Sequence, residues 1–250
     1  MLATRIIPVL LTAYDRLVKG ECFDSARVVG HAQQAAEVHQ ARSVDELILL
    51  DVRATLDNRG PDIAAIERLA STCFMPLTVG GGVTTLQHFR DLLAHGADKV
   101  SVGTAAWHDP QLIYEASQRF GAQAVVVSVD TARYGSQWRV TTHCASREHD
   151  ADAIRHAVNV VELGAGELLL NSVDRDGTMK GYDLDFIHQV ASRVDVPIIA
   201  CGGCGSYDHM LEAIKAGASA VAAGAFFQWT DATPKEAARY LASKGVETRI

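Results

Sequence analysis

The chain lacks any long apolar run and any excess of basic residues. No hydrophobic segment approaches the length of a membrane span, although 48% of the residues are hydrophobic, enough for a large core. The N-terminal sequence leads directly into a strand pattern and lacks the features of a signal or transit peptide. The net charge is −7 with Lys and Arg dispersed, which argues against nucleic acid but permits a small anion held locally. We expect neither a membrane nor a nucleic-acid partner.

Cysteine is also scarce, and its arrangement does not suggest a disulfide framework. The five cysteines form an odd, scattered set, Cys22, Cys73, Cys144, Cys201 and Cys204. Such a set favours free thiols in a reducing cytoplasm. Cys201 and Cys204 could be half of a zinc site or a redox pair, but no second ligand pair stands at metal spacing. The sequence therefore predicts a cytoplasmic protein with no metal and no other cofactor.

No Ser/Pro-rich or charged linker divides the 250 residues, and an internal repeat bridges the two halves instead. The segment 75–106 matches the segment 196–227 at a constant offset of 121 residues, with eight identities in 32 positions. Each copy has the pattern strand, Gly-rich loop, amphipathic helix, Gly-Ala turn and strand, which is typical of a βαβ unit. Two such copies favour a single domain over residues 1–250, a (β/α)8 TIM barrel built from two duplicated half-barrels.

Further strands and helix starts fit this alternation. Strands are predicted over residues 5–11, 46–51, 123–130 and 167–171, and the stretch after residue 134 could form a small hairpin. Residues 12–30 are too many for a tight connection and predict a long, charged and mobile loop with a function. Thr84 with Gln87, and Thr233 with Glu236, predict capped helix starts.

Glycines collect where the predicted strands end, and in such barrels the loops at these ends carry the chemistry. The matching positions are Gly81, Gly82 and Gly103 in the first half and Gly202, Gly203 and Gly224 in the second. Missing side chains let backbone N–H groups point at an anion, although glycines can also simply permit tight turns. The symmetry favours two anion sites on opposite sides of one mouth. The ligand would be elongated, with two phosphate-like ends or with one phosphate and another polar end.

Several motifs together resemble a known family. They are RII at 5–7, LVKG at 17–20, DELILLD at 45–51, PLTVGGG at 76–82, GADKVS at 96–101 and VDRDGT at 173–178. The chain resembles the cyclase subunit of imidazole glycerol phosphate synthase over essentially its whole length. In that family the barrel receives ammonia from a glutaminase subunit docked on its N-terminal face and adds it to a ribulosyl nucleotide with two phosphates. The resemblance implies an ammonia-dependent synthase or lyase-type subunit.

The resemblance also implies site residues. Those for the substrate and its phosphates are Lys19, Asp51, Gly81, Gly82, Gly103, Thr104, Asp176, Gly177, Gly202, Gly203, Gly224 and Ala225. Lys19 could instead be a solvated loop lysine. An ammonia gate is implied at four strand starts by Arg5, Glu46, Lys99 and Glu167, where a structural ion-pair plug is the alternative. Thr78 matches a channel position and Asp98 a position on the docking face.

The chain departs from the family at the reacting centre. The family uses carboxylates after two strands as general acid and base, and here Asp130 is present but Leu11 stands in the other position. Asp15, four residues further on, is not expected to replace it. Other departures are Gly103 in place of Asn, Cys201 and Ala225 in place of serines, and His31 in place of Asp. Together they point to a different substrate or a different chemistry.

A second group shares the scaffold, namely barrel subunits for acetamidino modification of surface-polysaccharide sugars, which also work with a glutaminase-like partner. The chain resembles them in IPVLL at 7–11, CFMPL at 73–77 and NSVDRDGTMKGYDL at 171–184. We favour such a paralogue, acting on a phosphorylated or nucleotide-sugar substrate. A genuine cyclase of histidine biosynthesis is the second hypothesis. A catalytically silent scaffold that activates a glutaminase is the third.

Overall fold

The structure is a computed structural model that describes residues 3–42 and 44–249. Eight strands form its centre: β1 (Arg5–Ala13), β4 (Leu47–Asp51), β5 (Leu77–Gly80), β6 (Lys99–Val102), β7 (Val125–Tyr134), β10 (Glu167–Ser172), β11 (Ile198–Cys201) and β12 (Ala220–Ala223). Each pairs in parallel with its neighbours in the order β10-β11-β12-β1-β4-β5-β6-β7, and β7 pairs with β10. The sheet therefore closes, which confirms the predicted (β/α)8 barrel.

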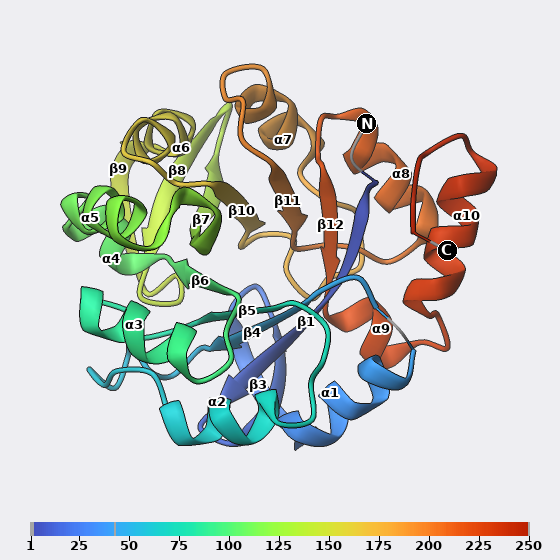
Figure 1. Cartoon of the computed structure of the whole chain (residues 1–250). Helices are drawn as coiled ribbons and strands as arrows, with labels where there is room; N and C mark the ends of the chain where they lie inside the picture. The colour runs from blue at the N-terminus through green and yellow to red at the C-terminus, as the bar shows by residue number, and fades with distance from the viewer. Residues whose placement is uncertain (1–2, 43, 250) are drawn as a thin grey trace.

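Helices surround this barrel (Figure 1). They are α1 (Ala32–Ala41), α2 (Ile63–Ala70), α3 (Leu86–Ala94), α4 (Thr104–His108), α5 (Gln111–Phe120), α6 (Ala153–Glu162), α7 (Leu184–Ala191), α8 (Tyr207–Lys215), α9 (Ala225–Trp229) and α10 (Pro234–Ser243), with the 3-10 turn η1 (Ala122–Ala124). One large apolar core lies between the strands and the helices. None of the helices in the described ranges combines the length and hydropathy that crossing a bilayer requires.

A second, smaller core fills the inside of the barrel. Its buried members are Ile7, Val9, Ile48, Val126, Leu169, Ile199, Cys201, Ala220 and Ala222. Because alternate residues of a strand face opposite sides, β1 directs Arg5, Ile7, Val9 and Leu11 inward in succession. The strand thus connects a charge at one end of the barrel with an apolar side chain at the other.

The internal repeat reappears in the structure at the same offset. β5, α3 and β6 correspond to β11, α8 and β12, and every boundary differs by 121 residues. Thr85 and Ser206, also 121 residues apart, cap the two helices, since their side chains accept hydrogen bonds from His88 N and His209 N. The prediction that Thr84 caps the first of these helices is wrong by one residue. The predicted capping box of Thr233 with Glu236 is confirmed.

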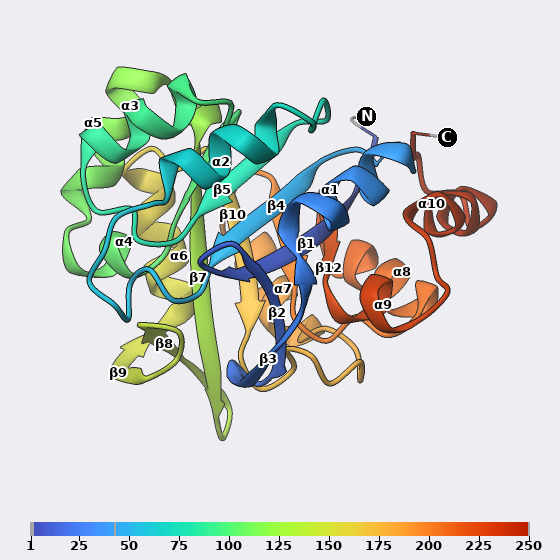
Figure 2. The same cartoon turned by 90° about the horizontal axis from the view of Figure 1, so that it is seen from below.

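Two antiparallel extensions leave the barrel. The first extension consists of β2 (Arg16–Glu21) and β3 (Asp24–His31) and pairs with the end of β1. The second consists of β8 (Gln137–Thr142) and β9 (Arg147–Asp152) and pairs with the end of β7. Figure 2 shows both projecting from the same end of the barrel, away from the chain termini. The predicted mobile loop over 12–30 is therefore wrong, since these residues form ladder hydrogen bonds, whereas the hairpin after residue 134 is confirmed.

Candidate active site at the C-terminal end of the barrel

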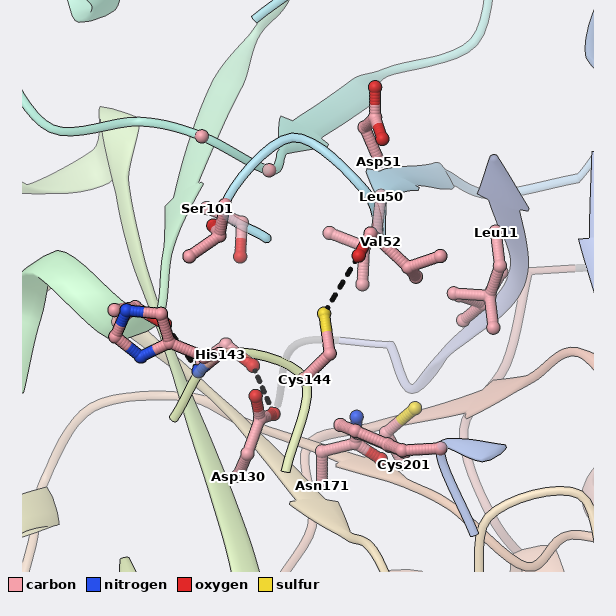
Figure 3. A pocket seen from close by; sticks show the side chains of 18 of the residues that line it. Leu11, Leu50, Asp51, Val52, Ser101, Asp130, His143, Cys144, Asn171 and Cys201 are labelled. Atoms are coloured by element: carbon pink, nitrogen blue, oxygen red, sulfur yellow. Dashed lines mark hydrogen bonds between the residues drawn. The ribbon is translucent and has the colours of Figure 1, made fainter. Parts of the chain in front are cut away.

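A cavity of about 730 Å³ opens at the C-terminal ends of the barrel strands. The last inward-facing side chains of the strands line its floor, including Leu11, Leu50, Ser101, Asp130, Asn171 and Cys201 (Figure 3). The predicted substrate and phosphate residues all line the same cavity: Lys19, Asp51, Gly81, Gly82, Gly103, Thr104, Asp176, Gly177, Gly202, Gly203, Gly224 and Ala225. The fold thus gathers residues that are up to 206 positions apart in the chain, from Lys19 to Ala225.

Asp130 is the carboxylate at the end of β7, and it is half-buried at the cavity floor. Ser128 Oγ donates a hydrogen bond to Asp130 Oδ1 over 2.9 Å. Desolvation raises the pKa of Asp130 to about 6, although hydrogen bonds from Ser128 and Asn171 oppose the rise. A carboxyl group that titrates near neutral pH can both give and accept a proton, as general acid-base chemistry requires.

Leu11 faces Asp130 from the opposite side of the cavity (Figure 3). Its side chain is half-buried and continues the apolar interior of the barrel. Asp15 does not take over this position, because its side chain is 62% exposed, pairs with Arg16 at 3.6 Å and lines a separate cavity outside the barrel. The end of β1 therefore offers the cavity an apolar surface where the family resemblance led us to expect a carboxylate.

The paired glycines have the backbone geometry that only glycine tolerates. Gly82 and Gly203 have φ of 70° and 101°, in the left-handed region that favours glycine. A Cβ atom on Gly82 would lie 2.4 Å from Arg59 O, and one on Gly203 would lie 2.2 Å from Gly181 O. Both loops are therefore compact turns whose backbone borders the cavity. The role of these loops in anion binding stays a prediction.

Gly103 and Gly224 do not adopt a left-handed backbone conformation, since their φ values are −108° and −102°. A Cβ atom on Gly103 would lie 3.7 Å from Ser128, an ordinary van der Waals distance, so the fold has room for a small side chain there. At Gly224, by contrast, a Cβ atom would lie 2.7 Å from Lys19 Nζ. The two halves of the cavity therefore differ, because the Lys19 side chain lies close to Gly224 and no side chain lies equally close to Gly103.

Lys19 is not a solvated loop residue, because only 4% of its surface is exposed. It lies on β2 and pairs with Asp176, which is 8% exposed, at 3.9 Å. Burial raises the pKa of Asp176, and the positive charge of Lys19 opposes this rise. A buried ammonium group beside Gly224 is well placed for an anion.

Asp51 and Thr104 have partners within the protein. The Asp51 carboxylate accepts hydrogen bonds from Arg53 N at 2.9 Å, Ala54 N at 3.1 Å and Arg59 Nη2 at 2.5 Å. It thereby shapes the loop after β4. Thr104 Oγ1 accepts a hydrogen bond from His143 N at 2.9 Å. Substrate contact at either residue stays a prediction.

The four predicted gate residues meet in one ring at the opposite end of the barrel. Arg5 bonds to Glu46 at 2.7 Å and also to Glu167, while Lys99 bonds to Glu46 at 3.1 Å and to Glu167 at 2.8 Å. Burial lowers the pKa of Arg5, but the bonds to the two glutamates outweigh this and raise it. Each cation thus pairs with both anions, as buried charges must.

The predicted channel and docking residues lie next to this ring. Thr78 is fully buried, and its Oγ1 donates to Glu46 Oε1 at 2.8 Å. Asp98 is exposed at the same end of the barrel, where its Oδ2 accepts from Leu77 N at 2.8 Å. The ring is thus continuous with a polar side chain inside the barrel.

Comparison with known proteins places this architecture in a family. The chain matches the histidine biosynthesis protein family over residues 5–232. It is 43% identical over 249 residues to imidazole glycerol phosphate synthase subunit HisF of Exiguobacterium sibiricum, and the match covers 100% of both chains. The chain belongs to the histidine biosynthesis protein family. The span matched to the histidine biosynthesis protein family contains every predicted site residue, from Arg5 to Ala225.

The five cysteines were predicted to be free thiols. All five are free, and desolvation raises the pKa of Cys201 and of Cys204 to about 12. Thiols with so high a pKa hold their protons near neutral pH. Within residues 3–42 and 44–249, no group of three or more His, Cys, Asp or Glu side chains could hold a metal ion.

Three residues of the cavity wall that sequence reasoning missed come from α4 and from the second extension. His108 comes from α4, while His143 and Cys144 come from the turn between β8 and β9. Cys144 Sγ donates to Val52 O at 2.9 Å, so this turn reaches across the mouth (Figure 3). The alternating pattern of residues 137–142 predicted a hairpin, but strand periodicity contains no information on where a hairpin tip folds back.

Proposed function

We propose that the chain is the ammonia-using synthase subunit of a glutamine amidotransferase whose acceptor differs from the imidazole-forming substrate. We infer an enzyme that forms an acetamidino-type group on a phosphorylated or nucleotide-activated sugar. The observation that carries this proposal is the combination of a complete charged ring at one end of the barrel with Leu11 facing the cavity at the other. We infer that a family barrel with this ring and without this acid would still receive ammonia but would carry out a different reaction in the cavity.

Ammonia would enter through the ring of Arg5, Glu46, Lys99 and Glu167 from a glutaminase subunit docked near Asp98. Its route would follow the inside of the barrel past Thr78 to the cavity. The test of this step is coupling. If Lys99→Ala leaves the ratio of glutamine-dependent to ammonium-dependent turnover unchanged, the ring is a structural plug and not a gate.

Two features of the cavity support an elongated, phosphorylated ligand. One end would rest on the loops at Gly203 and Gly224, beside the buried Lys19, and the other on the loops at Gly82 and Gly103. Backbone N–H groups at such turns bind oxyanions. Asp130 would then lie at the centre of the ligand, where it acts as the single general acid or base while ammonia attacks an activated carbon of the substrate.

A genuine cyclase of histidine biosynthesis is the second candidate function. The observation that favours it is the 43% identity over the full length of a HisF subunit. It requires a proton-transfer group in place of the missing carboxylate at the end of β1. A scaffold that only activates a glutaminase is the third candidate, and it predicts no turnover of any acceptor with free ammonium.

The chain can be tested in a histidine auxotroph that lacks its own cyclase subunit. Expression of the unmodified chain should fail to restore growth, because Leu11 cannot transfer a proton. The HisF subunit of E. sibiricum, expressed from the same vector, is the positive control. Growth with the unmodified chain at the rate of the control would contradict the proposal and favour the genuine cyclase.

A further inference from the structure

The two antiparallel extensions are counterparts within the duplicated fold. Each follows the first strand of its half, β1 or β7, and each has a turn with a cysteine in the left-handed region, Cys22 with φ 50° and Cys144 with φ 53°. Cys22 N donates to Asp176 O at 2.8 Å, and Cys144 Sγ donates to Val52 O at 2.9 Å. Each extension of one half is therefore anchored on a loop of the other half, next to the shared cavity.

The first extension also delivers a side chain across the halves. Lys19 of β2 is buried and places its ammonium group 2.7 Å from the position that a Cβ atom on Gly224 would occupy. Gly224 belongs to the second half. The β2–β3 extension thus supplies the cation at the glycine loop of the opposite half.

The second extension, in turn, places a residue at the glycine loop of the first half. His143 lies at the end of β8, lines the cavity, and donates its backbone N–H to Thr104 Oγ1 at 2.9 Å. Thr104 directly follows Gly103. The ring of His108, which also lines the cavity, lies 5.6 Å from that of His143. Two imidazoles therefore border the glycine loop of the first half, where Lys19 borders that of the second.

We propose that His143 is a ligand-binding residue that donates a hydrogen bond to the oxyanion of the ligand at the Gly82 and Gly103 loops. It is the counterpart of Lys19 at the other end of the cavity, and His108 supports its ring. This inference rests on the proposed function, since it assumes a ligand with an oxyanion at that end.

The backbone of the turn supports this role. His143, Cys144 and Ala145 have φ of 54°, 53° and 61°, three consecutive residues in a region that non-glycine residues avoid. Such conformations persist only where several contacts hold them, and they gather at ligand-binding sites. Here the contacts come from Thr104, from Val52 and from Ser146 Oγ, which donates to His143 O at 2.7 Å.

The hydrogen-bond pattern of His143 leaves one ring nitrogen for a ligand. Nδ1 lies 3.1 Å from Thr142 Oγ1, so Nε2 is the nitrogen directed elsewhere. Desolvation, with the nearby charges of Arg147, His108 and His149, lowers the pKa of His143, which favours a neutral ring with one N–H donor. Gly103 carries no side chain at this end of the cavity. One end of the ligand would thus meet an ammonium group and the other an imidazole, which fixes the direction in which the ligand binds.

The test is a titration of the full-length protein with inorganic phosphate, followed by NMR of the histidine rings and the glycine amides. In the wild type, the His143 and His108 ring signals should shift on the same binding curve as the Gly82 amide. His143→Asn removes the imidazole but suits a positive φ. This variant should bind phosphate about fivefold to tenfold more weakly, as measured at the Gly82 amide, which is the effect expected for one lost hydrogen bond. The affinity measured at the Gly203 amide should not change. His188→Asn, at an exposed position of α7, is the matched control and should change neither curve.

Two results would overturn the inference. If the Gly82 amide titrates while the His143 ring does not, or if His143→Asn leaves the Gly82 curve unchanged, His143 does not bind the oxyanion, and the proposed function stands. If neither glycine amide titrates, both this inference and the two-ended ligand of the proposed function are wrong. A thermal melt of His143→Asn that matches the wild type confirms that the variant is folded in either case.

Discussion

Asp130 is the residue whose surroundings bear most directly on the chemistry. It borders the cavity, accepts a hydrogen bond from Ser128 and has Leu11 opposite, and its pKa of about 6 is well above the usual value of 3.8. Since the folded protein holds this proton to higher pH than the unfolded chain does, ionisation of Asp130 opposes folding. Stability contributed by the protonated form is therefore lost as the pH rises from about 4 to about 6.

Asp130→Asn should reveal this loss. We take the free energy of unfolding of the variant and subtract that of the wild type. This difference should rise by about 1–2 kcal/mol between pH 4 and pH 7, because only the wild type loses stability over that range. The expected rise is smaller than for a fully buried group, because solvent in the cavity screens the carboxylate. Urea unfolding at several pH values measures the difference. Asp195→Asn, at an exposed site, is the control for the substitution itself. A flat difference for Asp130→Asn would mean that its pKa is not raised.

Residue-scale prediction succeeded where the internal repeat and the family motifs fixed a position. Arg5, Glu46, Lys99 and Glu167 meet in one ring, as expected from strand register and period-2 alternation. Leu11 and Asp130 both line the cavity. His143 could not be predicted in the same way. Its place depends on the tertiary contacts of a turn with Thr104, which no local pattern encodes.

At the scale of elements, the loops after the strands contain two kinds of glycine. At some positions the backbone conformation or a close contact excludes a side chain, and at others it does not. Gly203→Ala should destabilise the protein by about 1–3 kcal/mol, because the residue has a positive φ and its Cβ atom would meet Gly181 O at 2.2 Å. Gly103→Ala is the matched substitution, and it should change stability by no more than about 0.5 kcal/mol, since its Cβ atom has space. Urea unfolding of both variants tests the contrast, which equal losses would refute.

Element prediction was correct where hydrophobic periodicity was strong and failed where pairing was non-local. The βαβ repeats, with their buried four-residue strands, appear at the expected offset. The first extension was predicted as a mobile loop because its sequence is charged, whereas Leu17, Val18 and Lys19 are all buried in the structure, where β2 pairs with β1 and β3. The predicted helix start at Thr84 was displaced by one residue, since either of two neighbouring threonines can cap a helix and the structure has Thr85 as the cap.

At the scale of the whole molecule, the charged ring connects the two halves of the barrel. Arg5 and Lys99, of the first half, both bond to Glu167 of the second. Arg5→Met should leave the buried carboxylates of Glu46 and Glu167 with Lys99 alone and lower the free energy of unfolding by about 3 kcal/mol. Chemical denaturation measures the loss, and Arg193→Met, at an exposed position, is the control. A loss no larger than that of the control would show that the ring does not stabilise the barrel.

The closed barrel and its internal repeat could be predicted from the spacing of strands and glycines, because both depend on repeated local patterns. The acceptor could not, because the cavity is built by loops and by two extensions whose contacts depend on the complete fold. What remains to be measured is whether the chemistry of this cavity has departed from the cyclase reaction.

The most direct measurement is the initial rate of turnover of the histidine-pathway ribulosyl nucleotide by the purified chain in saturating ammonium, which removes the need for a glutaminase. The HisF subunit of E. sibiricum is assayed in parallel. Since a positioned acid-base group contributes about 10² to 10⁴ in rate, the expected rate for this chain is lower than that of the HisF subunit by about that factor. A rate equal to that of the HisF subunit would contradict the proposed change of acceptor.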